Sequence, residues 1–100
     1  MYTSKDIKHK QYVKQVIGEA ALYEQLAEEC TELAHAALKK ARKLRDENQT
    51  PLTDKEINDQ LAEEFTDLIL VSDILNMEPS QKILVYKLQR WAHRNGFTEN

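Results

Sequence analysis

The chain has few of the residues that cross-link, break or bend a protein fold. Its 100 residues include one Cys, two Gly and two Pro. A single Cys excludes an intramolecular disulfide and a metal site built from several thiolates. The scarcity of Gly and Pro, together with 41% hydrophobic and 31% charged residues, favours long amphipathic helices over disorder or a sheet-rich fold. We predict an all-α protein with Cys30 as a small core residue.

Long hydrophobic runs and an excess of positive charge are also missing. Nowhere do the roughly 18 apolar residues that a membrane span requires run together. The net charge of -3 provides no general basic field to hold nucleic acid or an anionic membrane. We therefore expect no nucleic-acid partner and no membrane partner. The polar, Lys-rich residues 1–14 favour a cytoplasmic location.

One eight-residue segment occurs twice, 35 positions apart. The first copy spans residues 26–33 and the second spans residues 61–68, and six of the eight residues are identical. Each copy carries two carboxylates three positions apart, which places both acids on neighbouring parts of one helical face. These four acids are Glu29, Glu32, Glu64 and Asp67.

Hydrophobic spacing and capping residues predict four helices in a single domain of residues 1–100. We place the helices at about 4–17, 19–45, 54–76 and 80–95. Gly18 separates the first two helices, and a capping box at residues 53–56 begins the third. Ser80 caps the fourth helix, which Gly96 ends. The segment from Asp46 to Leu52 is predicted to be a surface loop.

The repeated acids occupy positions where leucines are expected. At 100° per residue, Glu64 lies inside the apolar stripe of its helix and Asp67 lies at the edge. Glu29 and Glu32 occupy the same two places on the earlier helix. If the two stripes face each other in an antiparallel pair, the four acids meet at a partly desolvated seam. The alternative, a solvated acidic helix face, is the interpretation we give to Glu28 and Glu63.

Such a seam is unfavourable without a counter-charge. Each unpaired carboxylate removed from water costs several kcal/mol, and mutual repulsion raises at least one pKa. A divalent cation removes this penalty. Because the ligands are all oxygen atoms, Mg²⁺ is expected first and Mn²⁺ as a possible substitute. Mg²⁺ in proteins is usually completed by substrate phosphates, so the pattern points to metal-assisted phosphoryl chemistry.

The two acidic motifs resemble those of the all-α nucleoside triphosphate pyrophosphohydrolases, the MazG-like superfamily. Its ExxE and ExxD signature is matched by residues 29–32 and 64–67, and the similarity extends from about Gly18 to Arg94. The chain is most similar to small phage-type and Gram-positive MazG-like proteins, whose late Arg-Trp is matched at residues 90–91. The 31 residues between the motifs exceed the usual interval, which we attribute to a lengthened connection at residues 45–53.

The resemblance implies a four-helix MazG-like bundle and an enzyme that cleaves the α–β phosphoanhydride of a nucleoside triphosphate. The products would be a nucleoside monophosphate and pyrophosphate. All four repeated acids would bind Mg²⁺ and form the catalytic site, and Glu29 is the candidate for orienting or deprotonating the attacking water.

The substrate-binding candidates lie outside the repeat. Lys87, Arg90 and Arg94 form a basic ridge on the fourth helix, where the family often has cations that reach the phosphates; the ridge could equally be solvated surface. The ridge has three competitors for that role, which are Lys39, Lys40 and Arg42. Asn76, near the end of the third helix, is a candidate for a sugar or base contact. Because long apolar stripes on a chain of this size stay exposed, we expect a homodimer or homotetramer whose core is completed by self-association.

Two other function classes stay open. Glu32 and His35 form an ExxH pair of the kind found in ferritin-like di-iron proteins, but the third helix offers no matching His. The other class is a catalytically silent helical module that binds or dimerises.

Overall fold

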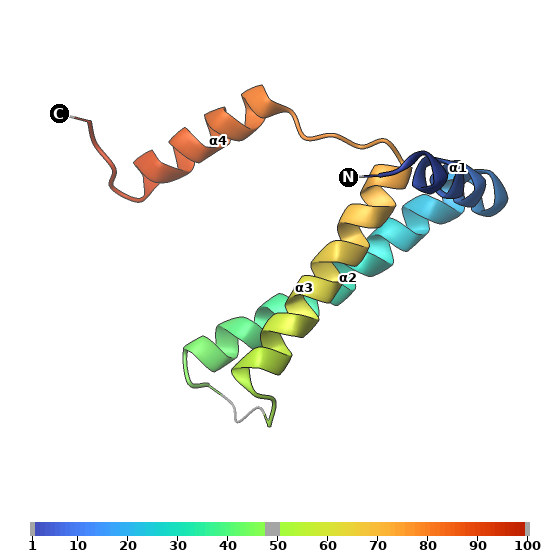
Figure 1. The fold of residues 1–100 in the computed structure, drawn as a ribbon. Helices are drawn as coiled ribbons and strands as arrows, with labels where there is room; N and C mark the ends of the chain where they lie inside the picture. The colour runs from blue at the N-terminus through green and yellow to red at the C-terminus, as the bar shows by residue number, and fades with distance from the viewer. Residues whose placement is uncertain (1, 48–50, 100) are drawn as a thin grey trace.

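The computed structural model describes residues 2–47 and 51–99, and in these ranges the chain forms four α-helices and no strand. The helices are α1 (Ser4–Ile17), α2 (Glu19–Leu44), α3 (Asp54–Ile74) and α4 (Gln81–Arg94) (Figure 1). The all-α prediction is confirmed, and each helix begins and ends within two residues of its predicted bounds. Residues 48–50 of the predicted loop lie outside the described residues. No helix in the described ranges is both long and apolar enough to cross a membrane.

Short capping motifs set the helix ends. Gly18 adopts φ +91 between α1 and α2, a backbone conformation that L side chains rarely adopt, and this break lets the chain turn there. At the start of α3, Thr53 Oγ1 accepts the Glu56 backbone N–H at 3.1 Å. Glu56 Oε1 in turn accepts the Thr53 backbone N–H at 3.0 Å, which confirms the predicted capping box. Ser80 Oγ accepts the Ile83 N–H at 3.3 Å and caps α4 as predicted.

The core lies between α2 and α3, which pack side by side along most of their length (Figure 1). Leu22 of α2 packs against Val71, Ile74 and Leu75 at the open end of this hairpin. Helix α1 covers that end through Val13. The burial of the apolar stripe of α3 is what brings the repeated acids inward, because Glu64 lies on the same stripe.

The prediction that Cys30 is a small core residue is wrong, because its side chain is exposed. Cys30 follows Glu29 directly, so it lies about 100° around the helix from the face that packs on α3. Because Glu29 points toward the seam between α2 and α3, the Cys30 side chain points to the surface.

Helix α4 stands away from the other three helices (Figure 1). In the described chain it packs on none of them, and its large hydrophobic side chains are exposed. Within the described residues of one chain, only α1, α2 and α3 therefore pack together. The predicted bundle completed by self-association stays a prediction.

Candidate metal centre

Three of the four repeated acids come together across the hairpin. Carboxylate oxygens of Glu29 on α2 and of Glu64 and Asp67 on α3 all lie within 4.8 Å of one another. All three residues are half-buried. The stripe positions predicted that all four repeated acids meet at this seam, and the antiparallel packing of α2 on α3 brings three of them together. Oxygen atoms are the ligands that hard divalent cations prefer in proteins.

The neighbouring acids and partial burial act together on the carboxyl group of Glu64. Partial burial raises the pKa of its carboxyl above the ordinary value of 4.5, and repulsion from Glu32 and Asp67 raises it further. Glu63 and Glu29 add smaller contributions in the same direction. The surroundings of Glu64 therefore disfavour its ionised form in the folded chain.

Glu32 lies at the margin of the site. It is exposed and is not one of the three residues whose oxygens converge. After burial, repulsion by the Glu32 charge is the largest cause of the raised pKa of Glu64. Glu32 therefore lies close enough to act on the cluster electrostatically. The structure thus gives Glu29, Glu64 and Asp67 the inner positions and Glu32 an outer one.

Gln25 is a site residue that the sequence reasoning missed. Its Nε2 donates a hydrogen bond to Glu29 Oε1 at 2.7 Å, one helical turn away on α2. This contact restricts the rotamers of the Glu29 side chain. The i,i+4 spacing of Gln and Glu is a known stabilising pair on helices and is the signal that could have found it.

The basic ridge of α4 is not part of this site within one chain. Lys87, Arg90 and Arg94 line a hollow of about 340 Å³ together with Trp91. Because α4 packs on no other helix in the described chain, these cations do not reach the acids of the hairpin. Their role at the phosphates of a substrate stays a prediction.

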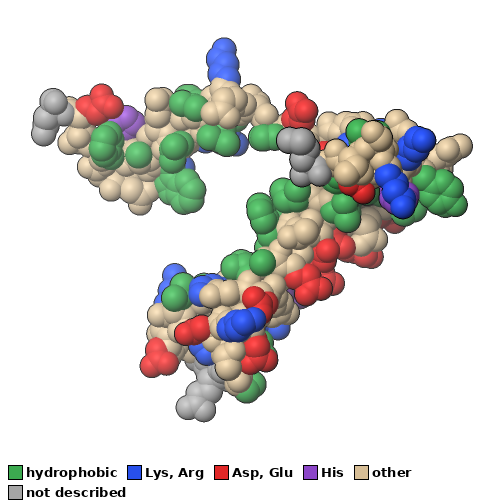
Figure 2. All heavy atoms as spheres, in the orientation of Figure 1, with side chains coloured by type: hydrophobic (Ala, Val, Ile, Leu, Met, Phe, Trp, Pro, Cys, Tyr) green, Lys and Arg blue, Asp and Glu red, His purple; other side chains and the backbone are tan. Residues whose placement is uncertain are grey.

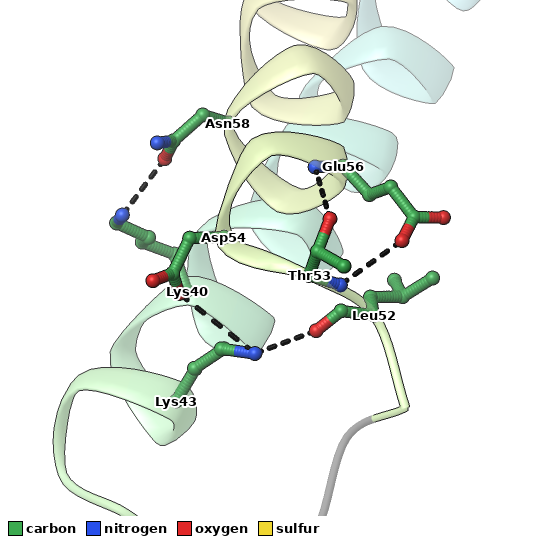
Figure 3. A network of polar contacts seen from close by, with 7 residues as sticks. All are labelled: Lys40, Lys43, Leu52, Thr53, Asp54, Glu56 and Asn58. Atoms are coloured by element: carbon green, nitrogen blue, oxygen red, sulfur yellow. Dashed lines mark hydrogen bonds and ion pairs between the residues drawn. The ribbon is translucent and has the colours of Figure 1, made fainter.

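Lys39 and Asn76 also lie apart from the converging acids. Lys39 follows Glu29 by ten residues, about 15 Å of helical rise along α2. Lys40 and Lys43, further along α2, link this helix to the segment that begins α3 at the loop end of the hairpin (Figure 3). Lys40 Nζ donates to Asn58 Oδ1 at 2.7 Å, and Lys43 Nζ donates to the Leu52 carbonyl at 2.6 Å.

Asn76 ends α3 in a left-handed conformation, with φ +58. Its backbone N–H donates to the Asp73 carbonyl at 2.9 Å, and the next N–H, of Met77, donates to the Ser72 carbonyl at 2.9 Å. These two bonds form a Schellman motif, in which Asn is the commonest residue after Gly. Asn76 thus has a structural reason to be present, separate from the predicted substrate contact.

The remaining predictions concern exposed side chains. Glu28 and Glu63, which neighbour the inner acids in sequence, are exposed, as expected for a solvated face. His35 is exposed as well, and among the described residues it is not part of a cluster with metal-ligand spacing. The ExxH pair therefore has no counterpart here that would favour a di-iron centre.

Comparison of the chain with protein-family models, curated proteins and solved structures gave no match. The resemblance to MazG-like enzymes rests on the two acidic motifs and their flanking residues.

Proposed function

We propose that this protein is a Mg²⁺-dependent nucleoside triphosphate pyrophosphohydrolase. The observation that carries the proposal is the convergence of Glu29, Glu64 and Asp67, one acid from the first repeat and two from the second, at the seam of two antiparallel helices. Helix packing alone gives no reason to place carboxylates on an apolar stripe, because their repulsion opposes folding. A cation-binding role supplies that reason.

The chemistry of the donors fits Mg²⁺. The three residues offer only oxygen ligands, and one face of the cluster stays open to solvent since the residues are half-buried. Glu29, Glu64 and Asp67 would hold the ion, with Glu32 at its outer side. When bound there, Mg²⁺ would neutralise charge on the triphosphate and lower the pKa of a bound water.

The side chains then take distinct roles. Glu29, held by Gln25, would orient or deprotonate the attacking water, because a fixed carboxylate beside the reacting atoms is suited to general base catalysis. Glu64 and Asp67 would balance the positive charge of the ion. The cations needed around a triphosphate would come from Lys87, Arg90 and Arg94 of a neighbouring copy.

The decisive experiment measures pyrophosphate release from a panel of ribo- and deoxynucleoside triphosphates with Mg²⁺, with Mn²⁺ and with EDTA. We expect release of pyrophosphate and monophosphate with either ion and none in EDTA. Glu64→Gln should lower kcat by at least about 100-fold, whereas Glu63→Gln, a matched change one residue away on the exposed side, should retain activity within about threefold. Equal losses in the two variants, or turnover that continues in EDTA, would contradict the proposal.

A second candidate function is a helical dimerisation module without catalysis. The exposed hydrophobic side chains of α4, including Leu88 and Trp91, favour it. The two candidates differ in one readout, since the module would self-associate and yet release no pyrophosphate from any nucleotide in the panel.

A further inference from the structure

Helix α4 is amphipathic, and its apolar face has no partner in the described chain. Leu84, Val85, Leu88 and Trp91 fall within an arc of about 120° at 100° per residue. All four are exposed, Leu88 by 60% and Trp91 by 66%. An isolated helix of 14 residues is marginal in water, so this helix needs a surface to pack on.

The hairpin carries a matching apolar face. On α3, the exposed residues Ala62, Phe65 and Ile69 lie about 100–160° around the helix from Glu64. On α2, Ala27, Cys30 and Ala34 lie at the same angles from Glu29, because they hold the corresponding positions of the repeat and its continuation. In two antiparallel helices, residues at equal angles from the line of contact point to the same side of the pair. The three residues of α2 and the three of α3 therefore lie on one side of the hairpin. We call these six residues the hairpin face.

Shape and charge favour α4 as its occupant. Two hollows flank α3 on this side, one of about 420 Å³ lined by Ala62 and Phe65 and one of about 530 Å³ lined by Ile69. Along the middle of the hairpin, hydrophobic side chains lie on the side turned toward α4, and Asp and Glu lie on the opposite side (Figure 2). Helix α4 carries four Lys and Arg and no acid, whereas α3 carries seven acids and one Lys.

The connection between α3 and α4 directs α4 away from its own hairpin (Figure 1). The Schellman motif at Asn76 fixes the direction in which the chain leaves α3. Pro79 then fixes its own φ and restricts Glu78 to extended conformations, so the short connection to Ser80 is stiff. Exchange of a terminal element such as α4 between copies is a low-cost route to a dimer.

The exposed area has the size that such an exchange requires. The chain has a radius of gyration of 17.8 Å, against about 13 Å for a compact chain of 100 residues. It exposes 8557 Å², against about 5,900 Å² for a compact protein of 11.7 kDa. Burying half of this excess in each of two copies would give about 2,700 Å² in total, within the range of obligate homodimers.

We infer that two copies of this chain exchange α4, so that the apolar face of α4 in each copy packs on the hairpin face of the other. This assembly holds whether or not the proposed hydrolysis occurs, since neither the apolar face of α4 nor the hairpin face includes the converging acids. It also makes Trp91, the only Trp of the chain, and Cys30, the only Cys, reporters of the two contacting surfaces.

The test follows three quantities in one dilution series of the full chain: mass by sedimentation, Trp91 emission and the alkylation rate of Cys30 by iodoacetamide. We expect a dimer with blue-shifted emission and a protected thiol. On dilution, the fall to monomer mass, the red shift of Trp91 and the faster alkylation of Cys30 should share one midpoint.

A matched pair of variants tests the contact itself. Leu88→Asp should raise the dimer dissociation constant by at least about 30-fold, whereas Gln89→Asp, which places the same charge outside the apolar face, should change it by less than about threefold. Circular dichroism of both variants checks that the hairpin stays folded. If one variant unfolds, the dilution series of the unsubstituted chain tests the inference by itself.

Three results would overturn the inference. The first is a monomer at all concentrations up to about 1 mM. The second is a dimer in which Cys30 reacts as fast as in the Leu88→Asp variant. The third is a fall to monomer mass without change at Trp91 and Cys30, which would mean that α4 packs on its own hairpin.

Discussion

Lys10 Nζ of α1 lies 3.4 Å from Asp73 Oδ2 at the end of α3. The same ammonium lies 5.8 Å from the centre of the Tyr2 ring. The two contacts link the start of the chain to the open end of the hairpin, where the buried core is concentrated. Asp73 lies on the opposite side of α3 from Glu64, so this acid serves helix packing while the repeated acids serve the seam.

The link between Lys10 and Asp73 predicts a specific dependence of stability on pH. The neighbouring Tyr2 hydroxyl and the Lys10 ammonium hold the pKa of Asp73 below its ordinary value of 3.8. Asp73 therefore stabilises the fold at neutral pH, and this contribution is lost as pH falls through the lowered pKa. Lys10→Ala should lower the melting temperature at pH 7, and the difference from the unsubstituted protein should shrink below about pH 4.

Lys8→Ala is the matched control, because Lys8 is exposed on the same helix. It should leave the melting temperature unchanged at both pH values. A pH-independent effect of Lys10→Ala would mean that the alkyl chain of Lys10, and not its charge, holds α1 in place.

Glu64 predicts the opposite pH dependence. Its pKa is raised above 4.5 by partial burial and by the surrounding acids, so the folded state favours the protonated form. As pH rises through the raised pKa, the ionised Glu64 destabilises the fold relative to the unfolded chain. In EDTA, Glu64→Gln should therefore melt at a higher temperature than the unsubstituted protein at pH 7, with a smaller difference near pH 4.

Added Mg²⁺ should reverse the order of these two melting temperatures at neutral pH, because only the intact cluster gains stability from the ion. Thermal melts at pH 4 and pH 7, with Mg²⁺ and with EDTA, measure both effects. If Glu63→Gln behaved identically to Glu64→Gln, the inward orientation of Glu64 would be wrong.

The core makes a simpler prediction. Leu22 is 2% exposed and contacts the end of α3, so Leu22→Ala leaves a cavity and should lower the free energy of unfolding by about 2–5 kcal/mol. Leu44→Ala at the end of α2, where the side chain is 74% exposed, should change it by less than about 0.5 kcal/mol. Urea unfolding followed by circular dichroism measures both. Similar losses at the two positions would contradict the observed register of α2.

Two substitutions of Asn76 distinguish its role in ending α3 from a role in binding the substrate. Asn76→Ala should lower the free energy of unfolding by about 1 kcal/mol, because Ala tolerates the left-handed conformation poorly, whereas Asn76→Gly should stay within about 0.5 kcal/mol. Both variants lack the amide side chain. An equal rise of KM for the nucleotide in both would support the predicted substrate contact, and unchanged KM values would leave only the helix-ending role.

Much of this structure was accessible from the sequence because its signals are local. Capping residues such as Thr53 and Ser80 bond to a backbone only three residues away, so the helix ends could be predicted closely. The inward position of Glu29 and Glu64 followed from periodicity, which depends on the helix alone. The prediction of Cys30 as a core residue was wrong, because its position one residue after Glu29 turns it about 100° away from the face that packs on α3.

The sequence by itself determined four helices, their ends and the repeated acids on two apolar stripes, since each depends on residues within a few turns of one another. Only the tertiary structure decided which three carboxylates converge, that Gln25 supports one of them, and that α4 packs on no other helix in the described part of the chain. These outcomes depend on the rotation and direction of whole helices. The rotation of α2 and α3 is set by packing between segments that are distant in the sequence. The direction of α4 is set by the stiff connection that precedes it.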